Sequence, residues 1–203
     1  MMKRRGFLQR ITVGGSVLAG AALPFGLARL LAPPVKADPH THLRPPGALS
    51  DDEAFVKACI GCGLCAEVCP PRCIKYYDRV GAEQVNTPYI NPESKACILC
   101  GKCMEACPTE ALTEVPIRQI DMGIAQIDRS ACYPWVDRGI CGACVSICPL
   151  GEQAIGFKMW NQYRPIVEKG CVGCGLCVEV CPEPSLPLRI VRRFEGTVAP
   201  HRI

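Results

Sequence analysis

Four cysteine runs constrain this 203-residue chain more than any other feature of its sequence. Sixteen of its 17 cysteines fall in these runs, and each run ends in a proline. The runs are Cys59, Cys62, Cys65 and Cys69; Cys97, Cys100, Cys103 and Cys107; Cys132, Cys141, Cys144 and Cys148; and Cys171, Cys174, Cys177 and Cys181. Three have the spacing C-x2-C-x2-C-x3-C, and the third stretches its first gap to eight residues. Corresponding runs recur after 73 or 74 residues, which indicates a duplicated two-run unit.

The spacing within a run suits ligation of a [4Fe-4S] cluster. Three closely spaced thiolates on a turn can surround one corner of a cubane, and glycine lets the backbone approach it closely. The glycines in these turns are Gly61, Gly63, Gly101, Gly142, Gly173 and Gly175. The third and fourth cysteines of a run are four residues apart, so a short helix would place both on one face before the proline ends it.

We expect four [4Fe-4S] clusters with crossed ligation, because in the bacterial-ferredoxin spacing the fourth cysteine of each run serves the cluster of the paired run. Site 1 is then Cys59, Cys62, Cys65 and Cys107, and site 2 is Cys97, Cys100, Cys103 and Cys69. Site 3 is Cys132, Cys141, Cys144 and Cys181, and site 4 is Cys171, Cys174, Cys177 and Cys148. A [3Fe-4S] cluster at site 3 is the alternative if Cys132 is not a ligand.

Disulfide bonds and structural zinc are the weaker interpretations of the cysteines. Disulfides give no reason for one spacing to occur four times with a proline after each run. Zinc sites use pairs of C-x2-C separated by a loop rather than three cysteines in one turn. Full four-cysteine ligation also leaves no iron open to a substrate, so we expect an electron carrier with no catalytic residues.

The sequence predicts an α+β fold of two tandem bacterial-type 2[4Fe-4S] ferredoxin modules, small and loop-rich. With only 12 aromatic residues, the clusters must form much of the core. Alternating stretches at 125–128 and 165–168 predict short strands before cysteine runs, and 111–114 is similar. We expect strand, cluster loop and short helix four times. The predicted division is a Pro-rich linker at 38–52, modules at 53–118 and 119–193, and a tail at 194–203.

Residues 1–37 have the layout of a bacterial export signal. They contain six basic and no acidic residues, an apolar stretch, and a small-residue pattern that predicts cleavage after Ala37. Arg4 and Arg5, followed by Gly-Phe-Leu, resemble a twin-arginine signal, which exports folded proteins. Retention as a membrane anchor is the alternative. The whole chain has a net charge of +4, so the remainder is net −2, and we expect no nucleic-acid partner.

The chain resembles the MauM/NapG family of ferredoxin-type proteins in its leader, in the segments Leu-Arg-Pro-Pro-Gly-Ala-Leu at 43–49 and Met-Gly-Ile-Ala at 122–125, and in the stretched third run. The resemblance implies a periplasmic, membrane-associated carrier beside a membrane quinol dehydrogenase-like iron-sulfur protein. It would pass single electrons to a periplasmic redox enzyme or cytochrome in nitrate reduction or methylamine utilisation. The alternative is an electron-transfer subunit of a multisubunit molybdenum oxidoreductase.

Three further features lie outside the predicted ligand sets. Cys73 lies outside the runs, and we expect a buried inert thiol rather than a substitute ligand or redox-active group. His40 and His42 lie in the Pro-rich stretch, where we expect solvated side chains rather than a metal pair. The insert at 133–140 is expected to be a packing lid over the third cluster, with a docking loop as the alternative.

Overall fold

The computed structural model describes residues 42–77, 85–158 and 163–193, within one compact unit that spans 37–203. The predicted signal with Arg4, Arg5 and Ala37, the residue His40 and the predicted tail at 194–203 lie outside the described residues. Among the helices that are described, none has the length and apolar character needed to cross a bilayer.

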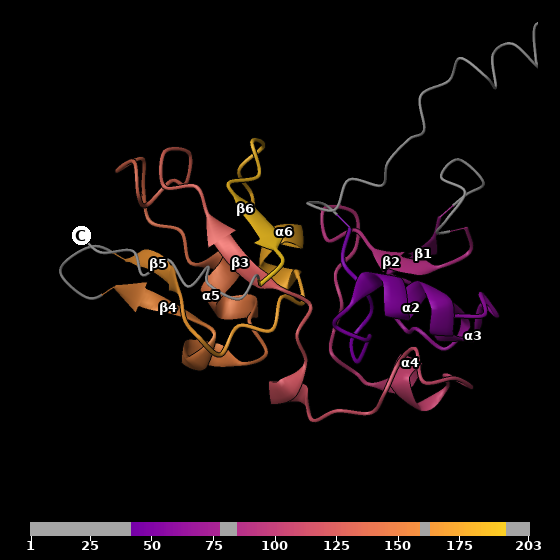
Figure 1. Cartoon of the computed structure of the whole chain (residues 1–203). Helices are drawn as coiled ribbons and strands as arrows, with labels where there is room; N and C mark the ends of the chain where they lie inside the picture. Colours follow the sequence, from indigo (N-terminus) through magenta and orange to yellow (C-terminus); the bar gives the residue numbers. More distant parts are fainter. Residues whose placement is uncertain (1–41, 78–84, 159–162, 194–203) are drawn as a thin grey trace, which may run out of the picture. The chain divides into compact units, whose positions relative to one another are not determined.

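The first half of the unit consists of short elements around one small sheet (Figure 1). They are α2 (Asp52–Ala58), α3 (Leu64–Glu67), β1 (Ile74–Tyr76), β2 (Pro88–Ile90), α4 (Lys102–Glu105) and the 3-10 helix η1 (Ile117–Gln119). Strands β1 and β2 pair antiparallel, with Ile74 opposite Ile90. Helix α2 starts where the Asp51 side chain accepts a hydrogen bond from the Ala54 N–H at 3.0 Å, and it buries Phe55 completely.

The second half contains two antiparallel strand pairs, β3 with β6 and β4 with β5 (Figure 1). Its elements are β3 (Ile124–Ile127), α5 (Ala143–Ile147), the 3-10 helix η2 (Gly151–Gln153), β4 (Ile155–Lys158), β5 (Arg164–Val167), α6 (Leu176–Glu179) and β6 (Leu188–Val191). The strands predicted at 125–128 and 165–168 are confirmed as β3 and β5, each one residue earlier. The α+β class is confirmed, and each sheet pairs strands within 53–118 or within 119–193.

One local prediction in the first half is wrong. Residues 111–114 form no strand, because their partner segment is rich in proline and offers only the single bridge from Leu112 to Ala48. The segment from 42 to 49, within the predicted Pro-rich linker, packs against the first half. Leu43 exchanges two backbone hydrogen bonds with Ile90, at 2.8 and 2.7 Å, and Pro45 and Pro46 are buried.

The bridge between Ala48 and Leu112 is the first-half counterpart of the β3–β6 pair. Gly47 and Gly123 both have positive φ, 74° and 126°, and a Cβ on either would collide with a backbone carbonyl oxygen of the opposite segment. The N–H of Thr113 donates to the Gly47 carbonyl at 2.9 Å, which holds the two segments together. The duplication seen in the cysteine runs therefore extends to the segments before them.

The repeated order of strand, loop and helix holds for three of the four runs, because the first run follows helix α2 instead of a strand. The helices also end before the fourth cysteine. In all four runs the N–H of that cysteine donates to the carbonyl three residues earlier, at 3.2 to 3.4 Å. Each fourth cysteine thus closes a tight 3-10 turn at the helix end, rather than sharing a helical face with the third.

Candidate iron-sulfur sites

The loops between the first and third cysteines turn sharply through left-handed backbone conformations. Gly61 and Gly173 have φ of 65° and 75°, and Leu99 occupies the corresponding place in the second run with φ of 59°. The Leu99 N–H donates to the Cys97 sulfur at 3.4 Å. Gly142 corresponds instead to the helix-start glycines Gly63, Gly101 and Gly175, which have φ of 86°, 78° and 87°, and it departs from them with φ of −133°. A Cβ there would touch the Phe157 ring.

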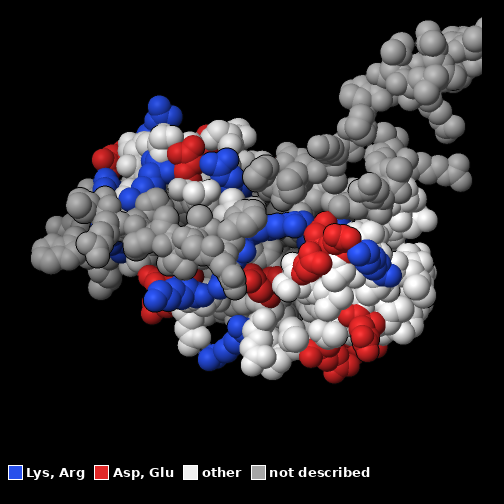
Figure 2. Space-filling model, viewed as in Figure 1, with Lys and Arg blue, Asp and Glu red and all other residues white. Residues whose placement is uncertain are grey.

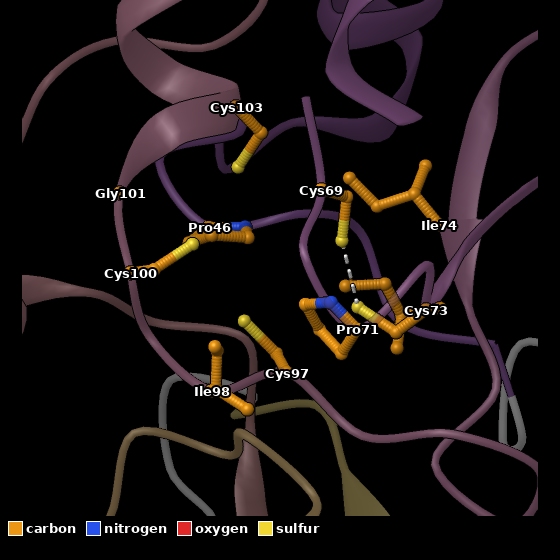
Figure 3. A pocket seen from close by; sticks show the side chains of 11 residues that line it. Pro46, Cys69, Pro71, Cys73, Ile74, Cys97, Ile98, Cys100, Gly101 and Cys103 are labelled. Atoms are coloured by element: carbon orange, nitrogen blue, oxygen red, sulfur yellow. Dashed lines mark hydrogen bonds between the residues drawn. The ribbon is translucent and has the colours of Figure 1, made fainter. Parts of the chain in front are cut away.

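All four predicted ligands of site 2 line one cavity. The space within this cavity, including the part that is open to solvent, has a volume of about 290 Å³. The lining includes Cys69, Cys97, Cys100 and Cys103, together with Cys73. Figure 3 shows these sulfurs around one space, enclosed by Pro46, Pro71, Ile74 and Ile98. Burial, followed by the negative charges of neighbouring thiolates, raises the pKa of Cys103 to about 12.

Site 4 is a matching cavity in the second half, with an empty volume of about 360 Å³. Its lining contains all four predicted ligands, which are Cys148, Cys171, Cys174 and Cys177. Burial raises the pKa of Cys174 to about 11, and the charges of Cys171 and Cys148 add to the effect. The Ala125 N–H from β3 donates to the Cys171 sulfur at 3.4 Å.

Site 3 brings the stretched run together with the end of the fourth run. The charges that raise the pKa of Cys132, after burial, include those of Cys181 and Cys141. Burial and then the charges of Cys132 and Cys141 raise the pKa of Cys144 to about 12. The eight-residue gap therefore does not carry Cys132 away from the other three thiols.

Site 1 places three of its predicted ligands together. Burial raises the pKa of Cys65, and the charges of Cys59 and Cys62 act in the same direction. The contacts of Cys107 are with the 109–112 turn: burial favours a higher pKa, but hydrogen bonds from Thr109 and from the backbone outweigh it and lower the pKa. The assignment of Cys107 to site 1 stays a prediction from the spacing.

The donor set fits an iron-sulfur cluster. Buried thiols crowded in this way resist ionisation, since each thiolate repels the next, and a positively charged iron centre removes that penalty. Among the described residues, no three His, Cys, Asp or Glu side chains are grouped so as to hold a single metal ion. Each set would hold its cluster through four cysteine sulfurs, and backbone N–H groups of Leu99 in a turn and of Ala125 in β3 are directed at sulfur.

Neighbouring sites are linked through specific cysteines. Cys65 of site 1 acts electrostatically on Cys103 of site 2, and Cys144 of site 3 acts on Cys177 of site 4. Between the halves, Cys97 of site 2 acts on Cys174 of site 4. The Cys97 N–H also donates to the Cys174 carbonyl at 3.0 Å. The four thiol sets therefore follow the order 1, 2, 4, 3.

The contact between the second and fourth runs is reinforced by a carboxylate. Glu179 at the end of α6 accepts hydrogen bonds from the Lys95 ammonium at 2.6 Å and from the Ala96 N–H at 2.7 Å. A Cβ on Gly175 would collide with Pro92, so only glycine lets the loops approach this closely. We call the contact between 92–97 and 174–179 the junction.

The remaining predicted residues take specific places. His42 is not solvated: it stacks on Tyr89, with ring centroids 4.1 Å apart, and its Nδ1 lies 3.1 Å from the Tyr77 hydroxyl. Cys73 is buried, and hydrogen bonds to Cys97 and Cys69, together with burial, raise its pKa. Sequence reasoning missed Tyr76, whose hydroxyl donates to the Gly63 carbonyl at 2.8 Å and lies 3.5 Å from the Cys65 sulfur.

The insert at 133–140 divides into a packed and an exposed part. Trp135 donates through its indole N–H to the Pro165 carbonyl of β5 at 3.0 Å. The guanidinium of Arg129 lies 4.1 Å from the centre of its ring. Ile140, at the other end, is 84% exposed immediately before Cys141. The insert thus has a packing element at one end and an exposed apolar tip at the other.

Comparison with known proteins agrees with this geometry. The model of the 4Fe-4S dicluster domain matches residues 58–111, 96–152 and 139–185. A methylamine utilization ferredoxin-type protein MauM from Methylobacillus flagellatus is 33% identical over 184 residues, which is 85% of this chain and 76% of that protein. The chain belongs to the MauM/NapG family. Its MauM relative from Paracoccus denitrificans is 32% identical over 94% of this chain and 87% of its own length.

A further member of the family, the ferredoxin-type protein NapG from Haemophilus influenzae, is 31% identical over 93% of this chain and 71% of its own length. Family membership makes this chain a ferredoxin-type iron-sulfur electron carrier. The second match of the family model, at 96–152, contains Cys132, whose electrostatic neighbours include Cys181 and Cys141.

Proposed function

We propose that this chain is a four-cluster relay that is exported in folded form and carries electrons between a membrane iron-sulfur protein and a periplasmic redox enzyme. The observation that carries the proposal is the continuous order of the four thiol sets. Helix α3 packs against α4 and α5 against α6, and the hydrogen bond from the Cys97 N–H to the Cys174 carbonyl joins the two pairs. A [4Fe-4S] cluster bound in each set would accept and release one electron. The protein holds neighbouring sets close and encloses them in apolar walls.

The two outer sets have exposed apolar residues beside them. Ile60, next to Cys59 of site 1, is 68% exposed, and Ile140 precedes Cys141 of site 3. On the face shown in Figure 2, acidic and basic side chains of the described residues are intermixed. These apolar tips are where we expect redox partners to dock, because a partner that approaches an outer site excludes water there.

The leader sequence supports the export route, and the named relatives support the pathway. The twin-arginine pattern at Arg4 and Arg5 supports delivery to the periplasm of a chain that already contains its clusters. The MauM relatives are methylamine utilization proteins by name, and the NapG relatives, through the resemblance, favour nitrate reduction. We propose a quinol-oxidising membrane iron-sulfur protein as the donor in either pathway.

The proposal is tested by anaerobic purification of the C-terminally tagged chain from membranes, followed by identification of the proteins that co-purify. A polytopic iron-sulfur protein without a molybdenum subunit supports the relay, whereas a stable molybdopterin subunit contradicts it. Docking is tested with Ile60→Asp and Ile140→Asp, each of which is expected to slow electron exchange with the captured partner. Ile117→Asp, at a 48% exposed residue away from the cysteine runs, is the matched control and is expected to have no effect.

A further inference from the structure

Site 2 differs from the other sites by its fifth cysteine. Cys73 stands just before β1, is only 2% exposed, and lines the same cavity as the four predicted ligands (Figure 3). Its sulfur lies 3.5 Å from that of Cys69, and Cys97 lines the same cavity. Cys73 therefore contacts the predicted ligand Cys69 inside the cavity that the second run also lines.

The chemistry of the site decides which of these sulfurs donates. A cysteine bound to iron is a thiolate, so Cys69 and Cys97 can only accept hydrogen bonds. A further thiolate at Cys73 would add an unpaired negative charge to a buried apolar pocket, at a large cost in free energy. Cys73 is thus a neutral thiol whose S–H is directed at ligand sulfur.

Among the corresponding positions of the four runs, only that of Cys73 carries a buried donor. Four residues after Cys181 of site 3 stands Ser185, whose exposed hydroxyl donates to the Glu183 carboxylate at 3.2 Å. Four residues after Cys107 of site 1 stands Ala111, which is 1% exposed and has no donor in its side chain. Four residues after Cys148 of site 4 stands Glu152, which is exposed. Because Ala111 fills its place in the same fold, alanine is a structurally acceptable residue at the position of Cys73.

We propose that Cys73 is a positioning residue of site 2 whose S–H donates to the Cys69 sulfur and raises the reduction potential of the cluster held there. The inference rests on the proposed function, since it assumes a [4Fe-4S] cluster at site 2. Hydrogen bonds to cluster sulfurs raise the potential because they stabilise the additional negative charge of the reduced state more than the oxidised state. The hydrogen bond from Cys73 thus gives the cluster at site 2 a reduction potential that differs from those of its neighbours, without adding a ligand.

The test is an EPR-monitored redox titration of the full-length, cluster-loaded protein under anaerobic conditions. In Cys73→Ala, the midpoint potential of one cluster is expected to fall by about 59 mV. For a one-electron couple, this corresponds to an about tenfold change in the oxidised-to-reduced ratio of that cluster at a fixed potential. Cys73→Ser keeps a donor and is expected to retain most of the wild-type potential. Ala111→Cys introduces the donor at site 1 and is expected to raise a different potential. Glu152→Ala is the matched control and should move none.

The outcomes separate this inference from the proposed function. Intact iron content in Cys73→Ala with every potential unchanged overturns the inference alone. Loss of one cluster's iron in both Cys73→Ala and Cys73→Ser also overturns it, because Cys73 would then be a ligand. Wild-type protein that binds no iron-sulfur cluster at all refutes the proposed function itself.

Discussion

Gly175 offers the sharpest test of the junction between the second and fourth runs. In Gly175→Ala the new Cβ collides with Pro92, and the backbone keeps a φ of 87° that favours glycine. Gly63 is the matched control, because it occupies the same place in the first run with φ of 86°. A Cβ there meets only the Tyr76 hydroxyl at 3.9 Å, which is an ordinary contact.

The expected magnitude follows from the difference between the two glycines. The left-handed conformation costs each alanine variant about 1–2 kcal/mol, and this cost cancels in the comparison. The collision adds about 1–3 kcal/mol in Gly175→Ala alone, which is the usual range for overpacking in a close-packed site. At about 1.4 kcal/mol per factor of ten, local opening of the junction becomes roughly 5-fold to 150-fold more frequent.

Anaerobic hydrogen exchange measures this opening directly. The relevant amides are those of Ala96 and Cys97, which donate across the junction to Glu179 and Cys174. Their exchange is expected to be faster by the stated factor in Gly175→Ala than in Gly63→Ala. Equal exchange at these two amides in both variants would refute the argument that the junction needs glycine.

Further predictions concern three other side chains. Tyr76→Phe removes the hydroxyl that donates to the Gly63 carbonyl, a hydrogen bond worth about 0.5–1.5 kcal/mol. Release of iron to a chelator should therefore accelerate roughly 2- to 12-fold. An unchanged release rate would contradict this prediction. Burial favours a higher pKa for Asp52, but the hydrogen bond and charge of Arg44 outweigh it and lower the pKa. The Asp52 contribution is therefore fully present above the ordinary value of 3.8 and is lost as pH falls through the lower folded value. In anaerobic thermal unfolding, Asp52→Asn should lower stability at pH 7 and flatten its decline toward about pH 3. If the stability of Asp52→Asn fell with pH as steeply as that of the wild type, the predicted role of Asp52 would be wrong. Trp135→Ala removes the packed part of the insert, so one cluster's EPR signal should be lost several-fold faster in air, and uniform loss of all signals would contradict the lid.

The spacing of the cysteines and the local alternation of the sequence predicted most of the features that recur along the chain. Equal cysteine spacing indicated the four sites. Cys69 lines a cavity with the second run and Cys148 lines one with the fourth, and their crossed ligation, typical of the bacterial-ferredoxin spacing, stays a prediction. Period-two alternation was sufficient for β3 and β5, in each of which the second residue, Ala125 or Pro165, is buried. In these cases the determining interactions lie within a few residues or follow a fixed spacing.

Features that depend on distant partners could not be predicted in the same way. Residues 111–114 alternate like a strand, but pairing depends on the proline-rich segment around Ala48. The bond between Lys95 and Glu179 joins residues 84 apart, and no local signal marks it. Cys73 was predicted to be an inert thiol because its sequence neighbours do not show that the fold directs it at Cys69 and Cys97.

Quantification of iron and acid-labile sulfide in the anaerobically purified full-length chain, combined with Mössbauer and EPR spectroscopy, tests the central claim most directly. Four cysteine-ligated cubanes predict about 16 iron and about 16 sulfide per chain, all in [4Fe-4S] form. Iron and sulfide near zero, with the thiols oxidised to disulfides or bound to zinc, would contradict the account.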